Sequence, residues 1–105
     1  MSVPGRDVID IGMCLTPMMY WAQYHFQSQG GAMITGSHNP KDWSGFKLAS
    51  GLSRTLVGDE IREILALVES DRFVEGKGTR RSESIAELYA GDLAGRVRMG
   101  KKLRV

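Results

Sequence analysis

The sequence predicts an α/β fold, because short apolar segments typical of strands alternate along its 105 residues with segments whose apolar residues recur at helical spacing. Residues 8–11 form a mostly β-branched run that ends at Gly12, which is typical of a buried strand. Apolar residues within 57–68 recur every three or four positions and form the clearest amphipathic helix in the chain. The full order of strand, helix, strand, strand and helix indicates one α/β unit.

The first predicted helix follows the first strand and begins at Thr16-Pro17. Threonine can cap the free N–H groups of a helix, and proline at the first helical position loses no hydrogen bond that the helix would have made. Because its apolar residues surround it, we expect this helix to be largely buried and to end at Gly30-Gly31. Its aromatic residues are expected in the core rather than on a stacking platform for bases or cofactors.

Two further strands are predicted on either side of a polar segment. Residues 32–35 form one strand, residues 46–48 form the other, and glycine, serine and proline lie between them. Loops held at strand ends are where functional sites concentrate on α/β scaffolds, so this segment is the candidate site. Gly36 is expected to take a backbone conformation that other residues avoid, and Pro40 to stiffen the exit of the loop.

The chain changes character after Asp71. The segment 76–83 is polar, charged and contains glycine, which predicts a linker. Ser84 and Glu87 have the spacing of a capping box for a following helix, and residues 103–105 are typical of a strand that has just begun. The basic residues that follow this helix have no interleaved aromatic residues, so we expect a solvated surface there rather than a nucleic-acid site.

Composition excludes several classes of protein. The 14 basic residues against 12 acidic ones leave a net charge of +2, too small an excess to predict nucleic-acid binding. No apolar stretch approaches the ~20 residues that span a bilayer, and no apolar signal region opens the chain. The single cysteine, Cys14, cannot form an intrachain disulfide. We therefore expect a cytoplasmic protein that contacts neither membrane nor nucleic acid.

Ser37 is the candidate nucleophile of the polar segment, although a serine in such a loop is more often a turn former or a cap. His38 is adjacent to it in sequence, so a catalytic triad within this loop alone is not expected. The two histidines, His25 and His38, and the single cysteine have no metal-ligand spacing. No Gly-Lys-Ser or Gly-Lys-Thr run marks a nucleoside-triphosphate loop.

A longer pattern favours the functional interpretation of this serine. Residues 32–48 read Ala-Met-Ile-Thr-Gly-Ser-His-Asn-Pro-Lys-Asp-Trp-Ser-Gly-Phe-Lys-Leu, which closely resembles the active-serine segment of the α-D-phosphohexomutases, a family that includes phosphomannomutase/phosphoglucomutase. Residues 7–12 and Thr16-Pro17 resemble the strand and helix that precede the serine loop in that family. Trp43-Ser44 departs from the tyrosine-asparagine usually found there.

The resemblance also implies an architecture. Residues 1–75 are expected to be the C-terminal part of domain I of a phosphohexomutase, a partial three-layer α/β/α domain with a mixed sheet. Residues 76–83 then form the linker, and residues 84–105 begin domain II with its first helix and a truncated strand.

The chemistry implied by the resemblance is a reversible transfer of phosphate between the 1- and 6-hydroxyls of a hexose phosphate, glucose or mannose, through a phosphorylated serine. Ser37 falls on the phosphoserine position, and Lys47 falls on the active-site lysine, a cation that can stabilise phosphate oxygens. His38 falls on the histidine beside the serine, with a role in substrate contact or proton transfer. A magnesium ion bound through the phosphate on Ser37, and hexose 1,6-bisphosphate as intermediate and activator, complete the implied site.

Several parts of such a mutase are not found in this sequence, including the aspartate-rich metal loop and the sugar-reading loop. We therefore expect the chain to be the serine-loop portion of the enzyme, with the remaining mutase domains absent, and to be inactive alone. We also expect the exposed edge of its first strand to favour self-association. The alternatives are a non-catalytic module that binds a phosphosugar or another anion, and an interaction protein that uses its basic tail.

Overall fold

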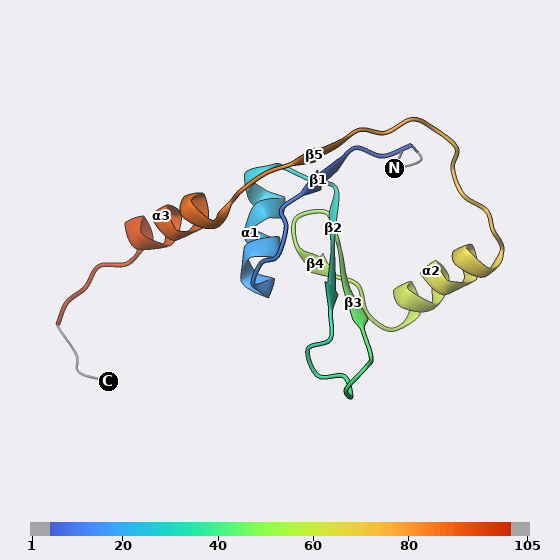
Figure 1. Cartoon of the computed structure of the whole chain (residues 1–105), viewed down its shortest axis with the longest axis horizontal. Helices are drawn as coiled ribbons and strands as arrows, with labels where there is room; N and C mark the ends of the chain where they lie inside the picture. The colour runs from blue at the N-terminus through green and yellow to red at the C-terminus, as the bar shows by residue number, and fades with distance from the viewer. Residues whose placement is uncertain (1–4, 102–105) are drawn as a thin grey trace.

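The computed structural model describes residues 5–101 and places five strands and three helices in that part of the chain (Figure 1). The α/β class is confirmed, whereas the strand expected at residues 103–105 lies outside the described residues. Within the described part, no helix has both the length and the apolar character needed to cross a membrane. The elements in chain order are β1 (Val8–Asp10), α1 (Thr16–His25), β2 (Gly30–Thr35), β3 (Gly45–Ser50), β4 (Arg54–Thr55), α2 (Asp59–Glu69), β5 (Arg80–Ser82) and α3 (Ala86–Arg96).

The strands form two sheets, one parallel and one antiparallel. β1 pairs in parallel with β5, and β2, β3 and β4 follow one another as an antiparallel sheet. Neither β4 nor β5 was predicted from the sequence, and β5 falls inside the segment 76–83 that was predicted as a linker. Arg80–Ser82 is polar and exposed, so it has no alternation of apolar and polar residues, and its main-chain pairing with β1 makes it a strand.

Helix α1 begins at the predicted residue but ends earlier than predicted. Pro17 occupies the first turn as predicted, whereas Thr16 is itself helical and makes no capping hydrogen bond. The helix ends at His25 instead of at the glycine pair, which opens β2. Gln27 takes a left-handed backbone conformation (φ 51°), and the amide of Ser28 donates to the carbonyl of Gln23 at 3.0 Å. This is a Schellman ending in which glutamine stands where glycine is usual.

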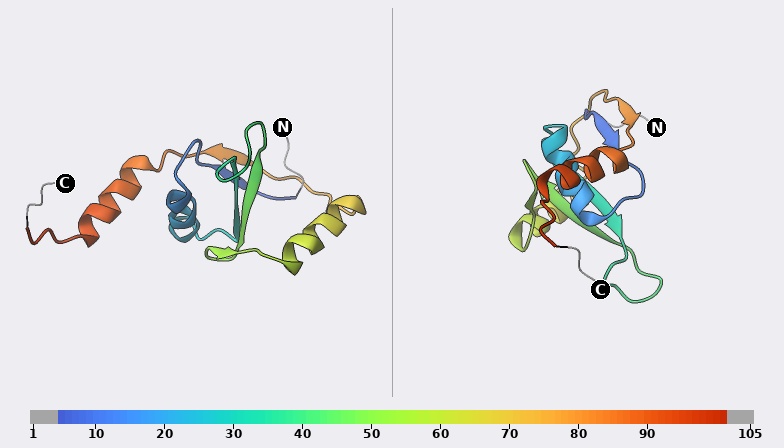
Figure 2. Two further views of the ribbon diagram at one scale, coloured as in Figure 1. Left: turned by 90° about the horizontal axis from the view of Figure 1, so that it is seen from below. Right: turned by 90° about the vertical axis from the view of Figure 1, so that its left-hand side faces the viewer.

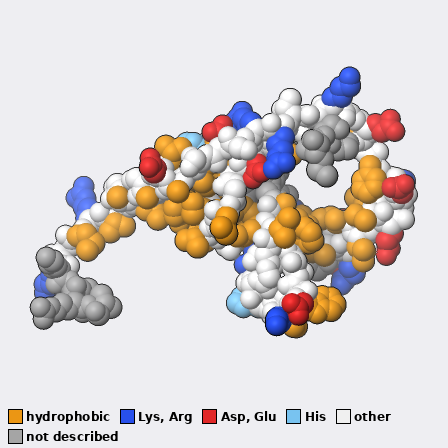
Figure 3. Space-filling model, in the orientation of Figure 1, with side chains coloured by type: hydrophobic (Ala, Val, Ile, Leu, Met, Phe, Trp, Pro, Cys, Tyr) orange, Lys and Arg blue, Asp and Glu red, His pale blue; other side chains and the backbone are white. Residues whose placement is uncertain are grey.

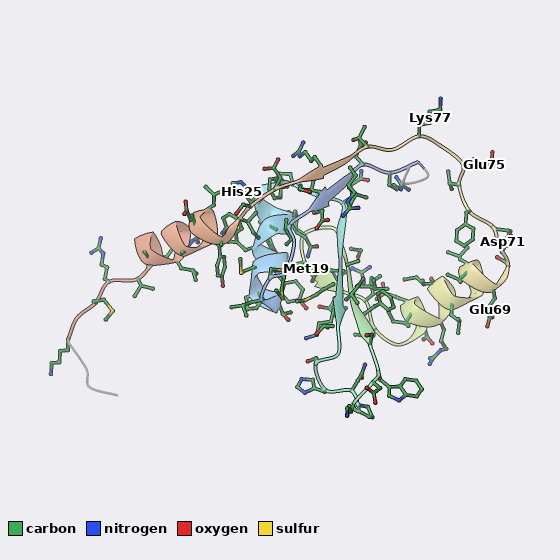
Figure 4. The ribbon with its side chains drawn as sticks, in the orientation of Figure 1. Met19, His25, Glu69, Asp71, Glu75 and Lys77 are labelled. Atoms are coloured by element: carbon green, nitrogen blue, oxygen red, sulfur yellow. The ribbon has the colours of Figure 1, made fainter. Side chains whose placement is uncertain are left out.

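Helix α1 covers one face of the hairpin formed by β2 and β3. The hydroxyl of Thr16 lies 3.5 Å from Sδ of Met33 on β2, and the side-chain oxygen of Gln23 accepts the amide of Ser53 at 3.1 Å. Met19, which lies on the part of α1 next to the hairpin (Figure 4), is buried. The predicted burial of α1 is therefore confirmed for one side only, since Tyr24 is 52% exposed.

Helices α2 and α3 occupy the predicted stretches, but their details differ from expectation. The capping box predicted at Ser84 does not form, because α3 begins at Ala86 after an N-cap, Ile85, that makes no side-chain capping bond. Helix α2 has the predicted amphipathic pattern, yet it contains no buried residue. Its apolar residues Ile61, Leu65 and Val68 are 40%, 54% and 54% exposed. The amphipathic pattern therefore predicted the helix but not whether its apolar face is buried.

Three aspartates connect the C-terminal part of the chain to the N-terminal part. Asp7 accepts the amide of Thr79 at 2.9 Å and its hydroxyl at 2.7 Å, and Asp10 forms an ion pair with Arg80. Asp92 on α3 accepts the indole N–H of Trp21 on α1. The hydrogen bond from the Thr79 hydroxyl lowers the pKa of Asp7, the one from Arg80 lowers the pKa of Asp10, and the one from Trp21 lowers the pKa of Asp92.

The molecule is elongated, and its core is small. Its principal extents are 57 × 33 × 24 Å, and the described residues bury four hydrophobic side chains, of which Ile85 is the most deeply buried at 2% exposure. Figure 2 shows α1 and α2 on opposite sides of the hairpin, with α3 projecting at one end. The core therefore lies where α1 meets the hairpin and the start of α3, and includes Met19, Ala22, Ala49 and Ile85.

Candidate active site

The hairpin holds the candidate serine loop at its free end. Strand β2 ends at Thr35 and β3 begins at Gly45, and these two residues lie directly opposite each other in the register. Residues 36–44 therefore form a loop whose two ends are fixed a few ångströms apart. The loop projects from the body of the molecule at the lower end of the hairpin in Figure 1, and its residues are exposed. A substrate can reach every side chain of this loop from solvent.

Hydrogen bonds within the loop shape its backbone. The amide of Ser37 donates to the hydroxyl of Thr35 at 3.3 Å, and the amide of Asn39 donates to the carbonyl of Gly36 at 2.7 Å. The amide of Trp43 donates to the carbonyl of Pro40 at 3.1 Å, which closes a second turn. The hydroxyl of Thr35 was not singled out from the sequence, although a threonine two residues before a serine is a known side-chain turn pattern.

Ser37 has the unusual backbone conformation that was predicted for Gly36. Its φ is +25°, a left-handed value that residues with a side chain seldom adopt, whereas Gly36 has no positive φ. The prediction that Gly36 takes an unusual backbone conformation was therefore wrong. A Cβ on Gly36 would lie 3.3 Å from the carbonyl oxygen of Trp43, so the close approach of the two sides of the loop favours glycine there. Such backbone outliers concentrate at functional sites.

Gly45 shapes the other end of the loop. A Cβ at this position would lie 2.8 Å from Nδ2 of Asn39 and 3.3 Å from the carbonyl oxygen of Thr35. The side chain of Asn39 thus occupies the space that a larger residue at 45 would need. Asn39 and Gly45 therefore act on the shape of the loop that carries Ser37.

Lys47 and His38 lie on different parts of the hairpin. Lys47 is half-buried on β3 opposite Met33, on the face that α1 covers, whereas His38 is exposed in the loop beside Ser37. Among residues 5–101, the side chains of Ser37, His38 and Lys47 form no hydrogen bond or ion pair with one another. Ser37, His38 and Lys47 therefore lie on the same hairpin but are not joined by hydrogen bonds or ion pairs.

No metal centre is formed by the described part of the chain alone. Residues 5–101 contain no group of three or more histidine, cysteine, aspartate or glutamate side chains that could hold a metal ion. The acidic residues Glu69, at the end of α2, and Asp71 and Glu75, in the segment that follows it, point outward from the molecule (Figure 4). Cys14 is half-buried, and burial raises the pKa of its thiol, which disfavours the reactive thiolate.

Comparison with known proteins gives consistent matches over this hairpin and beyond it. A family model described as phosphoglucomutase/phosphomannomutase, alpha/beta/alpha domain I, matches residues 2–75. A phosphoglucomutase of Neisseria gonorrhoeae is 39% identical over 103 residues, which is 96% of this chain and 22% of that protein. A phosphomannomutase of Vibrio cholerae is 40% identical over 92 residues, covering 85% of this chain and 20% of that protein.

A solved structure agrees with these sequence relatives. The crystal structure of a phosphoglucomutase/phosphomannomutase family protein from Burkholderia thailandensis is 29% identical and superposes with a TM-score of 0.76. The superposition covers 90% of this chain and 22% of that structure. The chain thus spans about a fifth of the length of the proteins that it matches.

Proposed function

The chain belongs to the phosphoglucomutase/phosphomannomutase family, and we propose that it is the serine-loop portion of a phosphohexomutase acting on glucose or mannose phosphate. The observation that carries the proposal is the placement of Ser37. This residue is exposed, has a left-handed backbone conformation and lies on a loop braced by its own hydrogen bonds at the end of a hairpin. A nucleophile that must meet a sugar phosphate needs this combination of access and fixed position.

In the proposed reaction, Ser37 carries a phosphoryl group on Oγ. A hydroxyl of the hexose monophosphate attacks the phosphorus, a new O–P bond forms, and the bond from phosphorus to the Ser37 oxygen breaks. The proton of the attacking hydroxyl passes to the Ser37 oxygen as that oxygen departs, so Ser37 is left as a free hydroxyl that can accept the other phosphate once the hexose bisphosphate has turned round. The second transfer reverses the first, so Ser37 is phosphorylated again and the phosphate has moved between the 1- and 6-hydroxyls.

Lys47 and His38 have supporting roles in this proposal. The Lys47 ammonium provides a fixed positive charge on the strand that follows the loop, where it can stabilise negative phosphate oxygens. His38 is adjacent to Ser37 and exposed, so it is suited to contact the substrate or to accept the proton of the attacking hydroxyl.

The described residues do not by themselves fit a magnesium ion. Magnesium is usually held by one or two carboxylates together with phosphate oxygens, and residues 5–101 gather no group of three or more metal-ligating side chains. The phosphate on Ser37 is the ligand that we propose from this chain. No step of the transfer described above depends on an ion that this chain holds alone.

We expect the isolated chain to have little or no turnover. Phosphoryl transfer gains its rate from charges arranged around the phosphate and from exclusion of water, and the loop residues 36–44 are exposed. Incubation of the chain with glucose 1-phosphate, magnesium and glucose 1,6-bisphosphate should therefore yield almost no glucose 6-phosphate. Conversion at the rate of a complete mutase would contradict this expectation.

A chimaeric enzyme tests the function itself. In this experiment the chain replaces the matching segment of the Neisseria gonorrhoeae phosphoglucomutase, with which it aligns over 103 residues. We expect the chimaera to convert glucose 1-phosphate and the Ser37→Ala variant to lose at least about a hundredfold in kcat, since loss of the phosphate carrier removes the reaction path. Ser44→Ala, in the same exposed loop, is the matched control and should retain activity. An active Ser37→Ala chimaera would refute the proposal.

A further inference from the structure

A tight turn in the serine loop places Ser37 where serine is unusual. The amide of Asn39 donates to the carbonyl of Gly36 at 2.7 Å, so residues 36–39 form a four-residue turn with Ser37 in second place. The φ of Ser37 is +25°, and turns with a positive φ at the second position normally carry glycine, asparagine or aspartate there. An ordinary turn, with a negative φ at this position, suits serine better. The observed turn therefore needs a contact that favours it over the ordinary one.

The side chain of Thr35 provides such a contact. The amide of Ser37 donates to the Thr35 hydroxyl at 3.3 Å. The peptide unit between Gly36 and Ser37 is thus held on both sides, by Asn39 at its carbonyl and by Thr35 at its N–H. A planar peptide unit turns over only if both of these hydrogen bonds break, and its orientation determines the φ of Ser37.

Thr35 belongs to the sheet, whereas Ser37 belongs to the exposed loop. Thr35 is the last residue of β2, is half-buried and lies opposite Gly45 in the register. Residues 36–44 are all exposed, and charged, histidine and hydrophobic side chains lie at the surface of the lower tip of the molecule (Figure 3). The hydrogen bond from Ser37 to Thr35 therefore ties an exposed loop to the more rigid strand before it.

Thr35 also lies on the same face of the hairpin as Lys47. Side chains alternate between the two faces of a strand, so Thr35 shares a face with Met33, and the register pairs Met33 with Lys47. Thr35 and Lys47 are therefore diagonal neighbours, a spacing of about 7–8 Å that a long side chain can bridge. Because its acceptor lies on this face, the amide of Ser37 is directed toward the side of the hairpin that carries the lysine.

We propose that Thr35 is a positioning residue for the nucleophile: its hydroxyl holds the left-handed backbone of Ser37 and keeps that serine on the Lys47 side of the hairpin. The inference rests on the proposed function, in which Ser37 carries the phosphoryl group and Lys47 stabilises its oxygens. Threonine suits this role because its β-branched side chain favours a strand and has few rotamers, so the acceptor oxygen stays in place. Thr35 acts through Ser37 and does not bind substrate, so loss of its hydroxyl should lower kcat and leave KM unchanged.

Variants of the chimaera with the Neisseria gonorrhoeae phosphoglucomutase separate the hydroxyl from the shape of the side chain. Thr35→Val keeps the β-branched shape without the acceptor, and its kcat should fall about ten- to a hundredfold. Thr35→Ser keeps the acceptor and should retain most of the kcat. Thr55→Val makes the same change at an exposed position on β4 of the same sheet, so it is the matched control and should alter neither kcat nor KM. Thr35→Ala also lacks the acceptor and covers the case in which valine prevents folding.

Crystal structures of these variants measure the backbone independently of activity. We expect a positive φ at Ser37 in the unsubstituted chimaera and in Thr35→Ser, and a negative φ in Thr35→Val. A chimaera that requires Ser37 but keeps its kcat in Thr35→Val would overturn the positioning role alone, and so would a loss of kcat with the positive φ retained. An active Ser37→Ala chimaera would instead refute the proposed function, and this inference with it.

Discussion

The indole nitrogen of Trp21 donates a hydrogen bond of 2.8 Å to Oδ2 of Asp92, 71 positions further along the chain. The same indole stacks on His25, with ring centroids 4.6 Å apart, and meets the edge of Tyr89 at 5.8 Å. One side chain of α1 therefore orients α3, which otherwise projects from the end of the molecule (Figure 2). The position of α3 depends on a few polar and aromatic contacts rather than on a large apolar core.

Trp21→Phe should loosen α3 without unfolding the hairpin. Phenylalanine keeps an aromatic ring but lacks the N–H that Asp92 accepts, so the amides of α3 should exchange with deuterium faster while those of β2 and β3 keep their rates. Trp43→Phe, in the exposed serine loop, is the control and should change neither. Unchanged exchange in α3 of the Trp21 variant would show that this hydrogen bond does not hold the helix.

Acid should weaken the contacts by which Asp7, Asp10 and Asp92 connect the N-terminal and C-terminal parts of the chain. Hydrogen bonds to the carboxylates hold the pKa values of Asp7, Asp10 and Asp92 below the ordinary 3.8. At pH values between the lowered and the ordinary pKa, the unfolded chain therefore binds more protons than the folded one. The stability from these contacts is therefore complete above about pH 5 and is lost as pH falls through the lowered pKa values. Urea denaturation between pH 2 and pH 6 measures it (about the range in which carboxylates titrate).

The control for this pH dependence is a variant with asparagine at all three positions, Asp7, Asp10 and Asp92. It should be less stable at neutral pH and should lose less of its remaining stability on acidification. A variant with the same pH profile as the natural chain would mean that other carboxylates control acid unfolding.

Ile85 should be the most costly apolar side chain to truncate. It is 2% exposed, and Ile85→Ala should lower the free energy of unfolding by about 2–5 kcal/mol, since it leaves a cavity as well as losing buried area. Ile61→Ala removes the same atoms from the exposed stripe of α2 and should change the free energy of unfolding by no more than about 0.5 kcal/mol. Denaturant titrations measure both free energies, and equal costs for the two variants would contradict the burial of Ile85.

Gln27→Gly should stabilise the end of α1. Gln27 has a φ of 51°, and left-handed backbone costs a residue with a Cβ roughly 1–2 kcal/mol, which glycine avoids at the expense of some chain entropy. We expect a net gain of about 0.5–1 kcal/mol in denaturant titrations. Gln27→Val should instead destabilise the chain, because a β-branched side chain tolerates this conformation least.

The local periodicity of the sequence predicted the helices and the central strands, and pairing between distant segments explains most of what it missed. Residues 57–68 and 32–35 carry patterns that need no partner to be recognised. β5 could not be predicted in the same way, because Arg80–Ser82 becomes a strand only through its parallel pairing with β1. The end of α1 was misplaced because glutamine, not glycine, takes the left-handed position.

The candidate site, too, was predicted only in part from the sequence. The motif around Ser37 predicted which residue to examine and that it lies in a loop after a strand, and the structure places it there. The left-handed backbone of Ser37 and the Thr35 hydroxyl that accepts its amide depend on how the loop closes, which composition and spacing do not specify. The catalytic roles of Ser37, His38 and Lys47, and the domain division at residues 76–83, stay predictions.

The location of phosphate after reaction with substrate tests the proposed role of Ser37. The chimaera with the Neisseria gonorrhoeae phosphoglucomutase should be incubated with glucose 1,6-bisphosphate and magnesium, digested, and mapped by mass spectrometry. We predict one phosphate on the peptide that contains Ser37, located on that residue by fragmentation and absent in Ser37→Ala. An active chimaera that carries no phosphate on Ser37, or carries it on Ser44, would contradict the proposal that Ser37 is the phosphate carrier.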